Sequence, residues 1–154
     1  MPTDTLKHAN SELVAAAFLQ SILGQSGGVG ARLPGDTASW ADTGFVQISV
    51  VGGSPNVYGP LRRPVLDVRA KWIAPASKQP PWYLANDLGE RILAGCYGAY
   101  QSPVEAILPS GFEKAFVQSA YALTEMRRMG GDDSNIATFQ FDLQVNWVGG
   151  GIGG

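Results

Sequence analysis

The sequence predicts an α+β domain in which two helices pack on one face of a four-stranded, mostly antiparallel sheet, with long loops between the elements. Three observations predict this fold: a strict alternation of side chains near the C-terminus, two stretches with helical spacing, and clusters of glycine and proline between the periodic segments. Each helix has one apolar stripe and the strands have one apolar face, so the helices are expected to cover that face.

The strongest signal is the alternation of apolar and polar side chains over residues 137–148. Successive side chains of a strand point to opposite faces of the sheet. One face would consist of Ala137, Phe139, Phe141, Leu143, Val145 and Trp147, and the other of Thr138, Gln140, Asp142, Gln144 and Asn146. We expect the apolar face to be buried. The second face has mostly amide and hydroxyl groups, which suits a surface covered by another protein.

Three other segments are predicted strands, at residues 45–51, 65–74 and 115–126. The second has Asp67, Arg69 and Lys71 on its outer side. The end of the third, 120–126, has a pattern that also fits a helix. Residues 126–135 would connect the third strand to the last one as a hairpin loop, since Gly130 and Gly131 favour a turn.

Two helices are predicted from apolar residues at spacings of three and four. The first begins after Ser11 as N-cap and stops at Gly24. The second opens at Pro80 and Pro81, where a proline loses no helical hydrogen bond, and ends at Gly98. Its buried stripe would consist of Leu84, Ala85, Leu88, Ile92 and Cys96.

The chain has 154 residues, which is enough for one well-buried core. We expect a flexible N-terminus at 1–9, a single domain at 10–148 and a flexible glycine-rich tail at 149–154. Charged residues make up 16%, below the roughly 25% that is usual, so part of the surface is expected to be covered in the working state. The net charge of -2 disfavours DNA binding, and no segment is expected to span a membrane.

No group of residues predicts catalysis, a cofactor or a metal site. His8 is the sole histidine and Cys96 the sole cysteine, so neither a catalytic triad nor a zinc site can be assembled, and Cys96 is expected to be buried and inert. Gly28-Val29-Gly30 lacks the context of a phosphate loop and is interpreted as loop. Asp132, Asp133 and Asn135 fit a turn, and Glu90 and Glu105 have no visible partner carboxylate. We expect the protein not to be an enzyme.

Two arginine pairs are the candidate interface residues: Arg62 and Arg63 in the first long loop, and Arg127 and Arg128 in the last hairpin loop. Binding residues concentrate on loops held by a rigid scaffold. These side chains are either solvated loop tips or groups that dock onto the opposite charges of partner subunits; contact with DNA is a third alternative.

Two segments carry a resemblance to a known family. Val50-Val51-Gly52-Gly53, followed by Arg63-Pro64-Val65-Leu66-Asp67-Val68, is similar to the corresponding strands of the tail terminator proteins of long-tailed, siphovirus-type bacteriophages. The order of helices and strands over roughly residues 10–148 also resembles that family, which shares architecture more than individual residues.

The resemblance implies a small α+β subunit of the virion that is assembled in the host cytoplasm. Its copies would form a homohexameric ring on the last ring of the tail tube protein, end tube growth and join the tail to the head–tail connector (stopper) protein, with DNA at most passing through the lumen. One alternative is another connector component such as the stopper, which is mainly β-barrel. An alternative of another class is a small ligand-binding module or hydrolase with a pocket of aromatic loop residues, namely Trp40, Tyr58, Trp82 and Tyr97.

Overall fold

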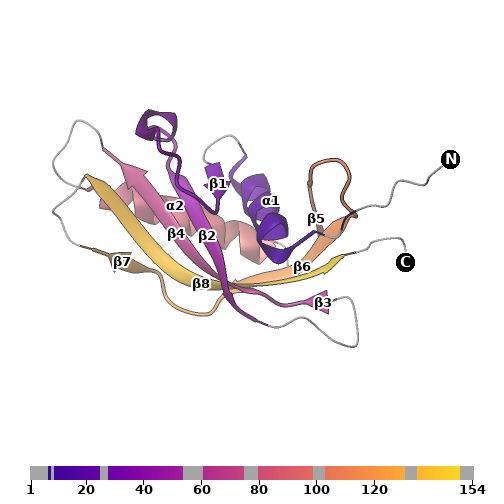
Figure 1. Cartoon of the computed structure of the whole chain (residues 1–154). Coiled ribbons are helices and arrows are strands. Elements are labelled where there is room, and N and C mark those ends of the chain that lie inside the picture. Colours follow the sequence, from indigo (N-terminus) through magenta and orange to yellow (C-terminus); the bar gives the residue numbers. More distant parts are fainter. Residues whose placement is uncertain are drawn as a thin grey trace.

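The computed structural model describes residues 7, 9–24, 28–53, 61–74, 80–98, 103–130 and 135–149. Two helices lie on the same side of one twisted sheet (Figure 1). The helices are α1 (Ser11–Leu23) and α2 (Trp82–Gly98), and a short 3₁₀ helix, η1, spans Thr37–Ser39. The strands are β1 (Gly28–Gly30), β2 (Phe45–Gly52), β3 (Leu61–Arg62), β4 (Val65–Ile73), β5 (Val104–Ala106), β6 (Ala115–Ala122), β7 (Arg127–Met129) and β8 (Ile136–Gly149).

The sheet is built around β8, the longest strand. The strand order is β1-β2-β4-β8-β6-β5, and β3 and β7 also pair with β8. On one side β8 contacts β4 and β3, and on the other it contacts β7 and β6. The alternation that predicted this strand therefore marks the centre of the sheet, where a strand has neighbours along both of its edges.

The prediction of a four-stranded, mostly antiparallel sheet is wrong, although the class α+β is correct. The sheet has eight strands and is mixed, because β1 runs parallel to β2. The four strands that were missed, β1, β3, β5 and β7, have only two or three residues each. A segment of that length has no recognisable period, and it forms a strand only because a long neighbour offers backbone partners.

Several local predictions change for the same reason. Residues 28–30 were expected to be a loop, but they form β1. Arg62 was also expected in a loop and lies in β3. The alternative helix at 120–126 is wrong, because β6 continues to Ala122 and the chain then turns into β7. Arg127 and Arg128 are consequently strand residues, paired in register with Gln140 and Phe139.

The core lies between the sheet and the two helices. Val14, Phe18 and Leu19 of α1 belong to the same buried cluster as Leu88 and Ile92 of α2. The inward residues of the central strands complete this cluster, and they include Val46, Ile48, Leu66, Val68, Ala70, Phe141, Leu143, Val145 and Trp147. A second, smaller cluster joins Trp40, Phe45 and Ile73 near η1.

The helix boundaries and faces differ slightly from those predicted. The N-cap of α1 is Asn10, whose Oδ1 accepts a hydrogen bond from Leu13 N at 2.7 Å, and Ser11 is the first helical residue. On α2, the predicted stripe is fully buried except for Leu84, which is 37% exposed. Neither described helix is long and apolar enough to cross a membrane.

The ends of the chain are described only in part. Lys7 bridges to Phe112, and Ala9 is buried. The other residues of the predicted flexible N-terminus, 1–6 and 8, lie outside the described residues, as do 150–154 of the predicted tail. Gly149 is the last residue of β8.

Candidate interaction surface

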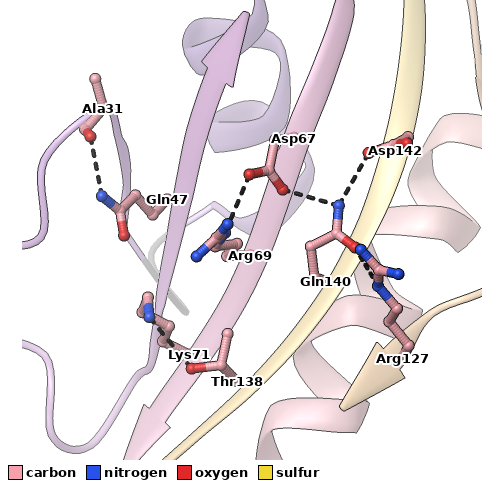
Figure 2. Close-up of polar contacts among 9 residues, drawn as sticks. All are labelled: Ala31, Gln47, Asp67, Arg69, Lys71, Arg127, Thr138, Gln140 and Asp142. Carbon is pink, nitrogen blue, oxygen red and sulfur yellow. Dashed lines mark hydrogen bonds and ion pairs between the residues drawn. The ribbon is translucent and has the colours of Figure 1, made fainter. Parts of the chain in front are cut away.

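The face of the sheet opposite the helices carries a row of polar side chains from neighbouring strands, which we call the outer face (Figure 2). Residues alternate between the two faces along each strand, so Asp67, Arg69 and Lys71 of β4 point outward while Leu66, Val68 and Ala70 are buried. The polar side chains of β8 follow the same rule. The sequence prediction of a polar outer face on these two strands is therefore confirmed.

Gln140 is the centre of the hydrogen bonds on this face. Its Oε1 accepts from Arg127 Nε at 2.8 Å, and its Nε2 donates to Asp67 Oδ1 and to Asp142 Oδ1, both at 2.9 Å. The amide thus presents its acceptor to a guanidinium and its donor to two carboxylates, which is the orientation that its neighbours require. Gln140 is only 5% exposed, so this part of the outer face is already covered by side chains of the same chain.

Two carboxylates face each other beside Gln140. Asp67 and Asp142 are direct cross-strand partners in the pairing of β4 with β8, and like charges in that position are destabilising. Arg69 Nε donates to Asp67 Oδ2 at 3.1 Å. The backbone N–H of Asp142 donates to Thr124 Oγ1 at 2.9 Å. Arg69 and Gln140 together therefore offset the repulsion between the two aspartates.

Lys71 continues the row toward the other end of β4. Its Nζ donates to Thr138 Oγ1 at 3.2 Å (Figure 2), and Thr138 is buried at 7% exposure. Burial lowers the pKa of Lys71 below its ordinary value, and the positive charge of Arg69 lowers it further, while Asp67 acts in the opposite direction. Lys71 is thus a partly buried cation whose nearest neighbours only partly compensate its charge.

The other half of the outer face is uncharged apart from one arginine. Gln144 Nε2 donates to Asn146 Oδ1 at 3.1 Å, and Asn146 Nδ2 donates to Ser119 Oγ at 2.9 Å. Next to these side chains lies an open hollow of about 570 Å³, lined by Leu61, Arg63, Gln118, Ser119, Tyr121, Gln144, Asn146 and Val148. This hollow is a part of the outer face where amide and hydroxyl groups line an open surface.

The four candidate arginines lie in different environments. Arg127 binds Gln140, and the guanidinium of Arg128 lies over the ring of Trp82, with its Cζ 4.6 Å from the ring centroid. Arg62 lies over Trp147 at 5.2 Å. Arg63 is exposed and lines the hollow. Among the described residues, three of the four thus contact another side chain, and Arg63 lines the hollow.

The described residues that were weighed for chemistry lie apart from one another. Cys96 is buried, as expected, and burial raises the pKa of its thiol from 9.0 to about 12, which disfavours the reactive thiolate. Glu90 and Glu105 are exposed on α2 and β5. Within the described part of the chain, no three His, Cys, Asp or Glu residues are grouped to hold a metal ion. His8, Asp132 and Asp133 lie outside the described residues.

The aromatic residues proposed for a ligand pocket have separate surroundings. Trp40 is buried in the small cluster with Phe45 and Ile73. Trp82 is the first residue of α2 rather than a loop residue, and its ring packs edge-on against Phe139 at 5.8 Å. Tyr97 is exposed near the other end of α2, and Tyr58 lies outside the described residues.

Sequence reasoning identified the polar side chains of β8 but not their network. Asp67, Arg69 and Lys71 were predicted only as the charged outer side of a strand, because their partners on β8 are distant in the sequence. Asp67 and Gln140 are 73 residues apart, and Lys71 and Thr138 are 67 residues apart. The available signal was the matching alternation in both strands, which predicts that the two polar faces align if the strands pair.

No protein-family model and no curated protein sequence matches this chain. Among solved structures, a chain from the virion of a native gene transfer agent particle is similar, with 13% sequence identity and a TM-score of 0.48. The similarity covers 90% of this chain and 96% of that chain.

Proposed function

We propose that this protein is a structural subunit of a phage-type virion, and specifically a tail terminator. Its copies would form a homohexameric ring that caps the tail tube, ends polymerisation of the tube protein and joins the tail to the stopper protein of the head connector. Assembly would take place in the host cytoplasm, and DNA would at most pass through the lumen.

The observation that carries the proposal is the arrangement of the two segments that resemble tail terminators. Val50–Gly53 and Arg63–Val68 are side by side, with Val50 opposite Leu66 and Gly52 opposite Val65 across a register shift. Gly53 has a φ of +86°, and a Cβ at this position would collide with the carbonyl oxygen of Arg63. The two segments are thus one structural unit, in which a glycine is needed where the chain leaves β2.

The outer face supports a binding role for this unit. The hollow on its uncharged half is lined by amide and hydroxyl groups and by Arg63, which suits a protein partner that is itself polar. Two helices on one side of the sheet argue against the alternative of a stopper built mainly as a β-barrel. The hydrolase alternative receives no support from Trp40, Trp82 and Tyr97, which lie in unrelated environments.

The test is assembly of the purified protein, followed by electron microscopy and sedimentation. The proposal expects closed rings, alone or on purified tail tubes, and capped tubes that no longer elongate. A particle that stays monomeric at high concentration and does not bind tail tubes would contradict it. Arg63→Glu should weaken docking of the ring to its partners, whereas Arg32→Glu, which reverses an exposed arginine away from the hollow, should not.

A further inference from the structure

One edge of the sheet is open along the second half of β2. The pairing of β1 with β2 ends at Gly30 and Gln47. Beyond that point, Ile48–Gly52 pairs with β4 on one side, and no described strand lies on the other. Val50 and Val51 in this stretch are 43% and 59% exposed. Backbone donors and acceptors on such an edge are a template for another strand.

The opposite edge is open along β6. The pairing of β5 with β6 covers only Ala115–Val117. After a register shift at Gln118, the part of β6 that includes Ser119 and Ala120 pairs with β8 on its inner side. No strand among the described residues lies beside these three residues on the outer side.

Both open stretches lack the residues that usually protect an edge. Charged side chains and proline prevent a free strand from pairing with another chain. Ile48–Gly52 and Gln118–Ala122 contain neither. The other edge strands on the β6 side do carry charge, with Glu105 in β5 and two arginines in β7. On the β2 side, the edge strand β1 is also without charge or proline, but it has only three residues. The two longer unprotected stretches therefore lie at opposite ends of one sheet.

The strand directions make these two stretches compatible with each other. The neighbours β2, β4, β8 and β6 are antiparallel at every step. β2 and β6 consequently run in opposite directions. If a second copy is placed beside the first in the same orientation, β6 of one copy meets β2 of the next as an antiparallel pair.

We propose that the open edge of β2 pairs with the open edge of β6 in a second copy of this chain, so that the sheet continues from one subunit to the next. Such a contact joins two different surfaces, and repetition of it gives a ring if the rotation closes. Backbone hydrogen bonds would supply the affinity, as in other cases of strand addition. The inference rests on the self-assembly proposed above, and it names the contact by which the copies associate.

The test uses positions whose backbone N–H points away from the sheet. Ala74 N donates to Asn135 O and Val145 N donates to Pro64 O, so even-numbered residues of β4 direct their polar groups toward β8. Leu66 is the partner of Val50, and the N–H of Val50 therefore faces away from β4. Leu123 N donates to Asp142 O, and by the same alternation the N–H of Ala122 faces away from β8.

Val50→Pro and Ala122→Pro each remove one outward donor without removing a bond inside the sheet. Each variant should abolish the oligomer in sedimentation and native mass spectrometry, while its circular dichroism spectrum stays that of the folded subunit. The matched controls Val50→Thr and Ala122→Ser keep the N–H and should assemble like the wild type. Assembly of both proline variants at wild-type concentrations would overturn the inference and leave the proposed ring intact.

Hydrogen exchange of the wild type gives a second readout that needs no variant. The amide of Val50, which lies beyond the pairing with β1, should exchange at least ~100-fold more slowly in the oligomer than in the dissociated subunit. Equal protection in the dissociated subunit would mean that another part of the same chain covers the edge, and would overturn the inference. A wild type that never associates would contradict both the inference and the proposed function, so the two failures are distinguishable.

Discussion

Asp67 and Asp142 lie directly opposite each other on β4 and β8, and the Nε2 of Gln140 donates a hydrogen bond to one carboxylate oxygen of each. The amide can do this because its own oxygen is held by Arg127. A neutral side chain thus connects two anions, and cations lie on both sides of it. Side chains of β7, β8 and β4 thus meet in one hydrogen-bonded group on the charged half of the outer face.

Gln140→Glu should destabilise the folded protein by about 1–3 kcal/mol, because it replaces the shared donor with a third carboxylate in a buried position. Urea denaturation followed by circular dichroism measures the change. Gln144→Glu is the matched control, since Gln144 lies on the same face of β8 but contacts the neutral Asn146. Equal stability of both variants would show that the network contributes nothing to folding.

Lys71 should make the free energy of unfolding depend on pH. Its pKa in the folded state is lowered from 10.5, so between the two pKa values the unfolded chain binds more protons than the folded one. Stability contributed at this site therefore increases as the pH rises toward 10.5 and is lowest when Lys71 is charged in both states. Lys71→Met should remove this increase.

The measurement is the difference in unfolding free energy between wild type and Lys71→Met from neutral pH to pH 10.5. Any stability advantage of the variant should shrink as the pH rises through this window. Lys114→Met, at an exposed position, controls for the loss of a lysine as such. A difference that stays constant across the window would contradict the assigned burial of Lys71.

Cys96 should be protected from thiol reagents in the folded protein. With its pKa near 12, only about one thiol in ten thousand is ionised at pH 8, and the side chain is fully buried. Labelling with Ellman's reagent should be slow and should follow the rate of unfolding. Rapid labelling of the native protein, at the rate seen in urea, would show that α2 opens far more readily than its packing indicates.

Gly53→Ala should cost at least about 1 kcal/mol, because the residue has a positive φ and its Cβ would collide with the backbone of Arg63. Gly35→Ala is the control, since a Cβ at that position meets no atom within 4 Å. Thermal denaturation of the two variants gives the comparison. The same melting temperature for both would mean that the exit from β2 adapts without strain.

Arg128 and Trp82 should couple by about 0.5–1 kcal/mol, the strength of a cation–π contact at an exposed site. A double-mutant cycle with Arg128→Ala and Trp82→Leu measures this coupling in urea. The contact joins β7 to the start of α2. Strictly additive effects of the two substitutions would show that the ring and the guanidinium do not interact in solution.

The fold was predictable where a pattern extends over many residues. Ala137, Phe141, Leu143, Val145 and Trp147 alternate over most of a strand, and all five are buried. Ala85, Leu88, Ile92 and Cys96 repeat at helical spacing and form the inner side of α2. Burial of one face requires such a period, so it could be recognised without any knowledge of what the segment contacts.

The candidate site was predictable only in part. The polar residues of β8 were identified as a surface, but Arg127 and Arg128 were assigned to a loop because the pairing partner of β7 is not encoded in its own three residues. Leu84 was assigned to the buried stripe of α2 from its spacing. Leu84 is 37% exposed, and what packs against that end of the helix cannot be recognised from the spacing of its residues.

The sequence by itself determined which segments have an apolar side and therefore which elements contribute to the core, because an apolar side can be recognised from the period of the segment. Only the tertiary structure decided the number of strands, the register that brings Gln140 between Asp67 and Asp142, and the two edges left open at β2 and β6. These features depend on backbone and polar partners that are distant in the chain, and a local pattern carries no information about where such partners lie.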